Sequence, residues 1–377
     1  MIFYTQINPM NILLTGATGT LGSRILYSLL EQRFDAIEQI YLPVRKKTTL
    51  TPEKRIENVI TSDFATEFIK KNRAAILNKI VVIDADEFLI PETFLGTKNR
   101  IDYFIHSAGF VNLSTDPKAK KEIFKENLQF TKDIFNAFYK HINKFVYIST
   151  AFASGNIGGL IQNDYSQLTS ENYRNHYEAS KHASEKFLTE AGKAKNIPVQ
   201  ILRPSVLGGN ILEHPNYFIS KYMVFYLFAK FFNSVTTDDQ VRITTTQTTG
   251  LNIIPTDYAA QVIAKVISTE IEQLNIVHSQ ETNMMNGIAK ILEVVGFNNF
   301  SFTEELINVK TGFSSKLEAF YYETIGVHLH PYMTSKASEW DTTLLESILP
   351  IPKYDLEDYL SETVLFAKAK NFRNQKW

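Results

Sequence analysis

The chain has 377 residues, enough for one large domain or two moderate ones with buried cores. Its 39 basic and 40 acidic residues give a formal net charge of −1, so no overall positive field attracts nucleic acid, and no nucleic-acid partner is expected. The absence of cysteine excludes disulfides, thiolate metal ligands and an acyl group carried on the enzyme as a thioester. We expect no metal site.

The N-terminus has neither the basic region nor the cleavage site of a signal peptide. The longest apolar run, residues 216–232, is interrupted by Lys221 and Lys230 and is shorter than the roughly 20 residues of a membrane span. We therefore expect a cytoplasmic protein without a transmembrane segment. The aromatic run leaves peripheral membrane contact open.

Short β-branched runs alternate with longer amphipathic patterns through the first two hundred residues. The expected strands are residues 11–15, 37–44, 79–84, 101–106, 144–150 and 198–204. Helical patterns such as TLGSRILYSLLEQ and KEIFKENLQFTKDIFNAFYKHI lie between them. This alternation predicts an α/β fold with a Rossmann-type, doubly wound parallel sheet whose strands are buried on both faces.

The pattern changes after Pro204. Residues 205–250 are typical of loops and one helix, and residues 251–268 return to a strand, a turn and a helix with Asp257 as the expected N-cap. From about residue 279 the chain is mostly helical and rich in Phe and Tyr. We expect a Rossmann domain of residues 1–204 continued by 251–278. Residues 205–250 and 279–377 would form a smaller substrate-binding region over the carboxyl edge of the sheet.

The stretch TGATGTLGSR follows the first expected strand and opens the first helix. Gly16 permits a sharp turn, Gly19 lets a pyrophosphate approach the backbone, and Gly22 allows the helix to pack closely on the strand. The free N–H groups at the start of the helix can bind phosphates. This context favours dinucleotide binding over an ordinary strand-to-helix turn.

Basic residues follow the second expected strand, at the place where an NAD-binding protein has an acid for the ribose hydroxyl. They are Arg45, Lys46 and Lys47, and Arg24 after the third glycine is expected to reach the same region. Guanidinium groups suit a 2′-phosphate, so we expect NADPH rather than NADH. A solvated basic loop would give the same pattern.

Four Tyr-x-x-x-Lys pairs occur in the chain, a spacing that places both side chains on one face of a helix. They are Tyr177/Lys181, Tyr217/Lys221, Tyr226/Lys230 and Tyr332/Lys336. Only Tyr177/Lys181 follows a strand that ends in Ser149 and Thr150, on the sheet that begins with the glycine loop. The two pairs in the aromatic run are expected to serve helical packing, and the fourth lies beyond the sheet.

The position of the first pair predicts carbonyl chemistry. We expect Lys181 to lower the Tyr177 pKa from about 10 and to hold the nicotinamide ribose. Tyr177 would protonate a carbonyl oxygen, and Thr150 would bind that oxygen. A strand-end hydroxyl that bonds its own backbone is the alternative for Thr150.

With these residues in hand, the chain resembles the extended short-chain dehydrogenase/reductase family over roughly residues 10–270. The similar elements are TGATGTLG, the ST that precedes YEASK, DYFIHSAGFVN, ILRPSVLGG and LNIIPTDYAA. Within the family, three segments are most similar to the thioester reductase and fatty acyl-CoA reductase branch, the male-sterility type. They are HSAGFVNLS, YISTAF and YEASKHASEK. The tail departs from the branch in having Trp340 where phenylalanine is usual.

The resemblance implies the catalytic residues Thr150, Tyr177 and Lys181 and a cofactor site distributed over the motifs. The implied cofactor-binding residues are Thr15, Gly16, Thr18, Gly19, Thr20, Leu21, Gly22, Arg24, Arg45, Lys46, Asp84, Ala85, Ser107, Ala108, Gly109, Val111, Asn127, Ser149, Tyr177, Lys181, Pro204 and Val206. Asp84 is preferred to Asp86 as the acid near adenine. Ser107 and Gly109 depart from the family's usual residues without removing a catalytic group.

The leading hypothesis is NADPH-dependent reduction of an acyl thioester, on coenzyme A or an acyl carrier protein, to an aldehyde or alcohol. Without cysteine, hydride must attack the thioester carbon directly. A ketone or aldehyde reductase, or a hydroxysteroid or nucleotide-sugar dehydrogenase, would use the same groups. A non-catalytic NADPH-binding protein predicts loss of the Thr/Tyr/Lys set, which is present. Acyl chain length, carrier and oligomeric state stay open.

Overall fold

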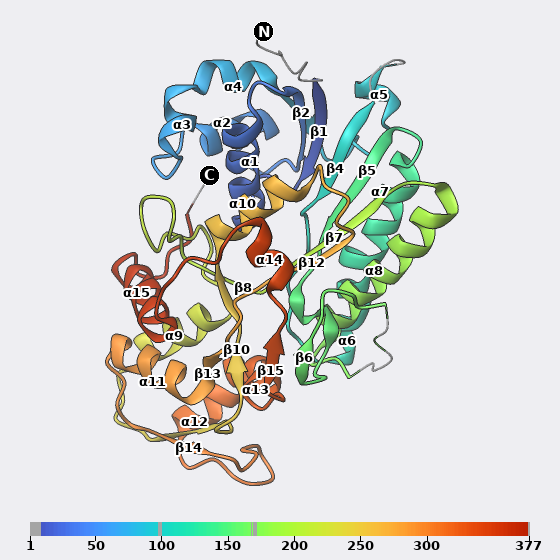
Figure 1. The fold of residues 1–377 in the computed structure, drawn as a ribbon. Coiled ribbons are helices and arrows are strands. Elements are labelled where there is room, and N and C mark those ends of the chain that lie inside the picture. The colour runs from blue at the N-terminus through green and yellow to red at the C-terminus, as the bar shows by residue number, and fades with distance from the viewer. Residues whose placement is uncertain (1–8, 97–99, 167, 169–171, 376–377) are drawn as a thin grey trace.

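The computed structural model describes residues 9–96, 100–166, 168 and 172–375. Within these ranges the main sheet has seven strands: β1 (Met10–Thr15), β2 (Ile37–Val44), β3 (Ile80–Asp84), β4 (Ile101–His106), β5 (Ile142–Ile148), β7 (Val199–Pro204) and β12 (Gln273–Ile276). All neighbours are parallel, in the order β12-β7-β5-β4-β1-β2-β3. The predicted doubly wound parallel sheet is confirmed (Figure 1).

Helices cover both faces of the sheet (Figure 1). One face carries α1 (Thr20–Arg33), α2 (Pro52–Ile60), α3 (Glu67–Lys71), α4 (Arg73–Lys79) and α10 (Thr256–Val266). The other carries α6 (Pro117–Phe124), the π-helical turn η1 (Lys125–Gln129), α7 (Phe130–Phe138) and α8 (His176–Lys195), and the short α5 (Glu92–Leu95) follows β3. Side chains alternate between the two layers: Ile12 and Leu14 lie in the first core and Leu13 in the second.

The rest of the chain forms a smaller part that lies below the sheet in Figure 1. Its helical elements are α9 (Phe225–Asn233), α11 (Met284–Val295), α12 (Lys316–Tyr321), η3 (Tyr322–Gly326), α13 (Val327–Met333) and α15 (Leu356–Ala369). Helix α14 (Thr343–Ile348) packs instead on α10 and β12, and its Leu345 belongs to the core of the sheet domain. Its two-stranded pairs join β8 (Val206–Gly208) to β11 (Ile253–Pro255), β9 (Val241–Thr244) to β14 (Phe300–Thr303), and β10 (Gly250–Leu251) to β13 (Thr282–Asn283). A fourth pair joins β6 (Gly159–Ile161), which follows the 3₁₀ turn η2 (Ala151–Ser154), to β15 (Ser338–Trp340). This part has an aromatic-rich core of its own.

Asp257 differs from its expected role as a helix N-cap. Helix α10 starts at Thr256, so Asp257 lies inside its first turn. The Asp257 Oδ2 atom accepts hydrogen bonds from three successive backbone N–H groups, those of residues 211–213, at 3.0, 2.6 and 2.8 Å. The prediction of an N-cap was therefore wrong. The carboxylate binds the backbone of a turn that is distant in sequence, and these bonds hold that turn against the start of α10.

The aromatic run is helical only in its second half. Tyr217 has a left-handed backbone (φ 63°), and its N–H donates to the Asn210 carbonyl at 2.6 Å. Helix α9 begins at Phe225, so the expected helical packing of Tyr217/Lys221 was wrong, whereas Tyr226 and Lys230 share this helix. No helix in the described ranges is long and apolar enough to cross a membrane.

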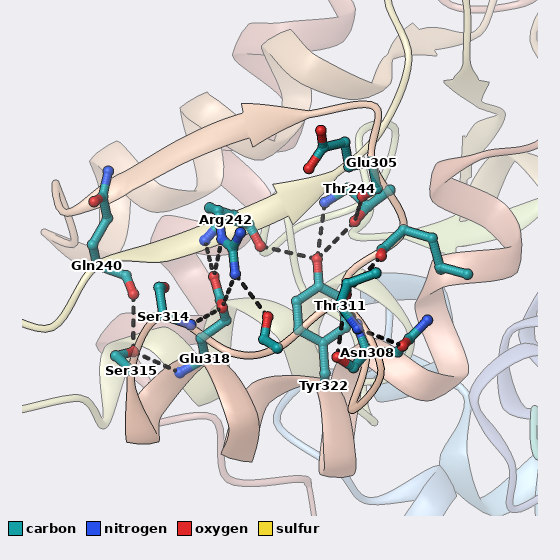
Figure 2. A network of polar contacts seen from close by, with 12 residues as sticks. Gln240, Arg242, Thr244, Glu305, Asn308, Thr311, Ser314, Ser315, Glu318 and Tyr322 are labelled. Atoms are coloured by element: carbon teal, nitrogen blue, oxygen red, sulfur yellow. Dashed lines mark hydrogen bonds and ion pairs between the residues drawn. The ribbon is translucent and has the colours of Figure 1, made fainter.

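An ion pair fastens β9 and β14 to α12 (Figure 2). The Glu318 side chain is fully buried, and Arg242 donates to it from its backbone N–H, Nε and Nη2 at 2.8, 3.0 and 2.8 Å. The Ser314 N–H adds a fourth bond at 2.6 Å. Burial would raise the Glu318 pKa, but the bonds from Arg242 and Ser314 outweigh it and lower that pKa from its ordinary value of 4.5 to about 2.

Glu318→Gln should lower the free energy of unfolding by about 2 kcal/mol at neutral pH, because it removes charge-assisted hydrogen bonds. A carboxyl whose pKa is depressed on folding stabilises the protein above 4.5 and loses that contribution as the pH falls through about 2. The difference between variant and wild type should therefore shrink on acidification. Urea unfolding at pH 7 and pH 3 measures it.

Glu323→Gln, at an exposed position of η3, is the matched control and should leave stability nearly unchanged. A pH-independent effect of Glu318→Gln would contradict the ionic account.

Candidate active site

The glycine loop is shaped by contacts that leave no room for side chains. Gly16 has φ +76°, and a Cβ on it would lie 2.9 Å from the backbone N of Ala108. A Cβ on Gly22 would lie 2.1 Å from the Gly16 carbonyl oxygen, and the Gly19 N–H donates to that oxygen at 2.8 Å. The loop after β1 therefore packs directly on the loop after β4, with the start of α1 beside it.

Thr15 and Asn127 hold the loop after β4 in place. The Thr15 hydroxyl accepts a hydrogen bond from the Ala108 N–H at 3.1 Å and bonds His106 Nδ1 at 2.8 Å. Asn127, in η1, accepts from the Phe110 N–H at 2.9 Å and donates to the Phe110 carbonyl at 3.1 Å. Burial lowers the His106 pKa to about 3, so this ring is a neutral structural partner.

Lys181 extends from α8 toward β5. It is almost fully buried, and its Nζ donates to the Ile148 carbonyl at 2.8 Å and lies 4.1 Å from the centre of the Tyr147 ring. A Cβ on Gly109 would lie 4.0 Å from the same Nζ and 3.9 Å from Asn127 Oδ1. Lys181, Gly109 and Asn127 are therefore brought together at the carboxyl ends of β4 and β5.

Two hydroxyls follow β5, which runs from residue 142 to 148 and not to 150 as expected. The Thr150 hydroxyl accepts a 3.4 Å bond from the Phe152 N–H and so caps η2, a turn that packs against α8. A hydroxyl that bonds its own backbone was the alternative expected for Thr150. The bond uses only an oxygen lone pair, however, so the hydroxyl proton of Thr150 is still free to donate. The Ser149 hydroxyl is buried without a hydrogen-bond partner in the described part of the chain.

Tyr177 lies in the first turn of α8, one turn before Lys181, and Asn175 caps this helix by accepting from the Glu178 N–H at 3.0 Å. Burial raises the Tyr177 pKa above its ordinary value of 10, and the Lys181 charge offsets only part of that rise. The expectation of a lowered pKa was therefore wrong, because desolvation of the phenolate outweighs the ammonium. Tyr177 carries its proton at neutral pH, the form that a proton donor needs.

Arg24 does not lie with the other basic residues. It is buried in α1, where its Nη1 donates to Glu213 Oε2 at 2.8 Å and its Nη2 to the Phe64 carbonyl at 3.1 Å. The expectation that Arg24 reaches a 2′-phosphate is corrected by these contacts. Its charge is already compensated by Glu213, from the segment that follows β8.

Arg55, and not Arg24, lies beside the glycine loop, and it was not among the residues expected from the sequence. Its Nη1 donates to the Arg45 carbonyl and its Nη2 to the Thr18 hydroxyl, both at 2.7 Å. Burial lowers the Lys47 pKa, and the nearby charges of Arg55, Lys221 and Arg45 lower it further. The signal in the sequence was Arg55 at the start of a helix ten residues after Arg45. Lys221 comes from a distant segment and gives no local signal.

The remaining expected cofactor residues lie along the same edge. Lys46 pairs with Asp84 Oδ2 at 2.5 Å, and the Ala85 N–H donates to the Val44 carbonyl at 3.2 Å. The others are Thr20 and Leu21 at the start of α1, Ser107 and the half-exposed Val111 after β4, Pro204 at the end of β7, and Val206 in β8.

The tyrosines of two other pairs have structural partners of their own. The Tyr226 and Thr363 hydroxyls are hydrogen-bonded at 2.6 Å. The Tyr332 hydroxyl accepts from Asn175 Nδ2 at 2.8 Å, which brings this residue to the N-terminus of α8.

These groups fit a nicotinamide dinucleotide. The loop around Gly16 offers backbone in close approach where a Cβ would collide with Ala108, as pyrophosphate binding requires. The Ser149 hydroxyl is buried without a hydrogen-bond partner among the described residues, and it lies with the Lys181 ammonium near the carboxyl end of β5, where the nicotinamide half would lie.

Comparison with known proteins agrees with this geometry. An NAD-binding family model described as "Male sterility protein" matches residues 14–263, well over half of the chain. The chain belongs to this family. The predicted resemblance to the thioester reductase and fatty acyl-CoA reductase branch is thereby confirmed, as is membership of a family of NAD(P)-dependent oxidoreductases.

A putative fatty acyl-CoA reductase of Drosophila melanogaster, CG8303, is 25% identical over 233 residues, which cover 54% of this chain and 42% of that protein. The chain thus spans less than half of that relative's length. The terminal R domain of the myxalamid PKS-NRPS pathway has the same fold, with TM-score 0.70 and 20% identity over 98% of this chain and 93% of that one. UDP-glucuronic acid 4-epimerase of Bacillus cereus, solved with NAD, matches at TM-score 0.62 and 17% identity over 97% and 99%.

Gly16→Ala should abolish measurable dinucleotide binding, because the new methyl group would meet the Ala108 backbone at a positive φ. Gly296→Ala is the matched control, since Gly296 also has a positive φ (+83°) but nothing lies within 4 Å of its Cβ position. Fluorescence titration with NADPH measures both, and circular dichroism checks folding. Wild-type affinity in folded Gly16→Ala would contradict the assigned phosphate loop.

Proposed function

We propose that this protein is an NADPH-dependent reductase of acyl thioesters, carried on coenzyme A or an acyl carrier protein, and that it acts in the cytoplasm. The observation that carries the proposal is the position of Tyr177 on α8, one turn before the buried Lys181, beside a dinucleotide loop. The names of the relatives support a thioester as substrate. A chain without cysteine must reduce such a substrate without an acyl-enzyme.

Thr150, Tyr177 and Lys181 would each have a separate role in reduction of the thioester carbonyl. NADPH, when bound, supplies a hydride to the acyl carbon. The Thr150 and Tyr177 hydroxyls donate hydrogen bonds to the carbonyl oxygen as negative charge develops on it. When the carbon–sulfur bond breaks, the thiol leaves with one proton and the aldehyde remains, so one hydride and one proton are consumed for each thioester.

A second round on the aldehyde would give the alcohol. Tyr177 would then transfer its proton to the oxygen, and the adjacent Lys181 would stabilise the phenolate left behind. The Lys181 ammonium already has the Ile148 carbonyl and the Tyr147 ring as partners, which fix its position before substrate binds.

Reduction of a ketone, aldehyde or nucleotide sugar is the second candidate, because the epimerase of Bacillus cereus shares the fold. Release of free thiol distinguishes the two. Incubation with NADPH and palmitoyl-CoA should release one thiol for each thioester reduced, and NADPH oxidation without thiol would favour the second candidate.

The 2′-phosphate is the feature that would select NADPH. Arg45, Lys47, Arg55 and Lys221 gather beside the glycine loop, and the pKa of Lys47 is lowered by burial and by its cationic neighbours. A dianionic phosphate would relieve this repulsion and accept bonds from the guanidinium groups. Lys221 belongs to the smaller part, so a bound 2′-phosphate would also link it to the sheet.

Tyr177→Phe should lower kcat by at least about 100-fold, since general acid catalysis contributes this much, and leave NADPH affinity nearly unchanged. Tyr226→Phe tests the same substitution in another Tyr-x-x-x-Lys pair, and its activity should stay close to that of the wild type. Absorbance at the NADPH band and thiol titration give the rates. Full activity in Tyr177→Phe would refute its role.

Arg55→Gln should weaken NADPH binding by roughly 10-fold or more, in line with the loss of a charge-assisted bond, with little effect on NADH. Lys54→Gln is the control, because Lys54 is exposed and pairs with Glu57 on the solvent side of α2. Titration calorimetry with NADPH and with NADH measures the ratio of the two dissociation constants in each variant. Equal losses for NADPH and NADH would mean that Arg55 only supports the loop through Thr18.

A further inference from the structure

A buried ion pair lies at the start of α8, next to the proposed proton donor. The Glu178 side chain is fully buried, and the Arg174 side chain is 6% exposed. The Arg174 backbone N–H donates to Glu178 Oε2 at 2.9 Å, and its Nη1 donates to Glu178 Oε1 at 3.2 Å. A buried pair is weak evidence for stability, because the cost of removing two charges from water can cancel their attraction. We therefore looked for what this pair holds in place.

The Arg174 guanidinium also contacts two aromatic rings. Its Cζ atom lies 5.6 Å from the centre of the Phe152 ring and 5.3 Å from the centre of the Tyr332 ring. The two rings pack edge-on, with 5.7 Å between their centres. Phe152 belongs to η2, and its N–H donates to the Thr150 hydroxyl at 3.4 Å. Arg174 therefore joins the start of α8 to the turn that bonds the Thr150 hydroxyl.

Tyr332 connects this cluster to the smaller part. It lies in α13, and its hydroxyl accepts from Asn175 Nδ2 at 2.8 Å. Asn175 Oδ1 in turn accepts from the Glu178 N–H at 3.0 Å and so caps α8. The fourth Tyr-x-x-x-Lys pair, which lies beyond the sheet in sequence, thus reaches the first turn of α8 through its tyrosine.

We propose that Arg174 and Glu178 are positioning residues of the active site, which fix the start of α8 against η2. Tyr177 lies in the first turn of α8 and Thr150 directly precedes η2, so the pair sets the separation of their two hydroxyls. The inference rests on the proposed carbonyl chemistry and adds two residues that act through others. Such positioning governs the rate, because a misplacement of about 1 Å can cost about 100-fold.

Glu178 also acts on Tyr177 through its charge. Burial is the main cause of the raised Tyr177 pKa, Lys181 lowers that pKa, and Tyr147 and Glu178 raise it further. A carboxylate beside the phenol disfavours the phenolate and so keeps the proton donor protonated. Loss of this charge should let Tyr177 ionise at a lower pH, an effect that a purely structural role would not produce.

Glu178→Gln should lower kcat for palmitoyl-CoA by at least about 10-fold through misplacement of Tyr177, while KM and NADPH affinity stay nearly unchanged. On the alkaline side, kcat should fall at a lower pH than in the wild type, because the phenolate cannot donate a proton. Glu190→Gln, at an exposed position of the same helix, is the matched control and should behave as the wild type in both respects.

A second variant guards against misfolding, because Glu178→Gln leaves the Arg174 charge buried without a carboxylate. Replacing both members of a buried pair by apolar residues is often neutral or stabilising. Arg174→Met/Glu178→Met should therefore unfold in urea as the wild type does and still lose at least about 10-fold in kcat. Wild-type kcat in the folded double variant would overturn the proposal while leaving thioester reduction intact.

Ionisation of Tyr177 can also be followed without substrate, by ¹³C NMR of protein labelled at the tyrosine Cζ atoms. The resonance that is missing in Tyr177→Phe identifies the residue. It should titrate at a lower pH in Glu178→Gln than in the wild type, and an unchanged titration would overturn the proposal. A wild type that reduces no thioester would refute the reductase assignment, whereas this titration tests the proposal in the same protein.

Discussion

The buried ammonium of Lys181 is the constraint on which the site depends. A charge removed from water is costly unless it is compensated, and this one is held by the Ile148 carbonyl and the face of the Tyr147 ring. Both partners belong to β5, so the contact fixes how far α8 advances along the sheet. That position puts Tyr177 at the carboxyl edge. The Asn127–Ser180 hydrogen bond of 3.0 Å ties the same helix to η1, and Asn127 also bonds Phe110 in the loop after β4.

The smaller part is joined to this edge by polar contacts that reach deep into the sheet domain. Arg24 of α1 is paired with Glu213, and Asp257 of α10 holds the turn at residues 211–213. Asn175 links α8 to Tyr332 of α13. These contacts hold the smaller part against the start of α8, which carries Tyr177.

The sequence predicted the elements better than their partners. Apolar runs that are buried on both faces identify β2 and β4 to the residue, because burial is a local pattern. The glycine spacing located the loop, since only glycine fits against Ala108. Contacts between distant residues could not be predicted: Arg24 is taken by Glu213, Arg55 lies beside Thr18, and Asp257 caps a turn far along the chain. The expectation of a lowered Tyr177 pKa was wrong for the same reason, because desolvation of the phenolate depends on all the residues packed around the ring.

The central claim is that Tyr177 and Thr150 both bind the oxygen of a thioester carbonyl. A crystal structure with NADP⁺ and an acyl-CoA analogue in which CH₂ replaces the thioester sulfur, so that the carbonyl is a ketone, tests it most directly. We predict the ketone oxygen within about 3 Å of the Tyr177 Oη and Thr150 Oγ1 atoms. A ligand bound with that oxygen turned away from both hydroxyls would contradict the account.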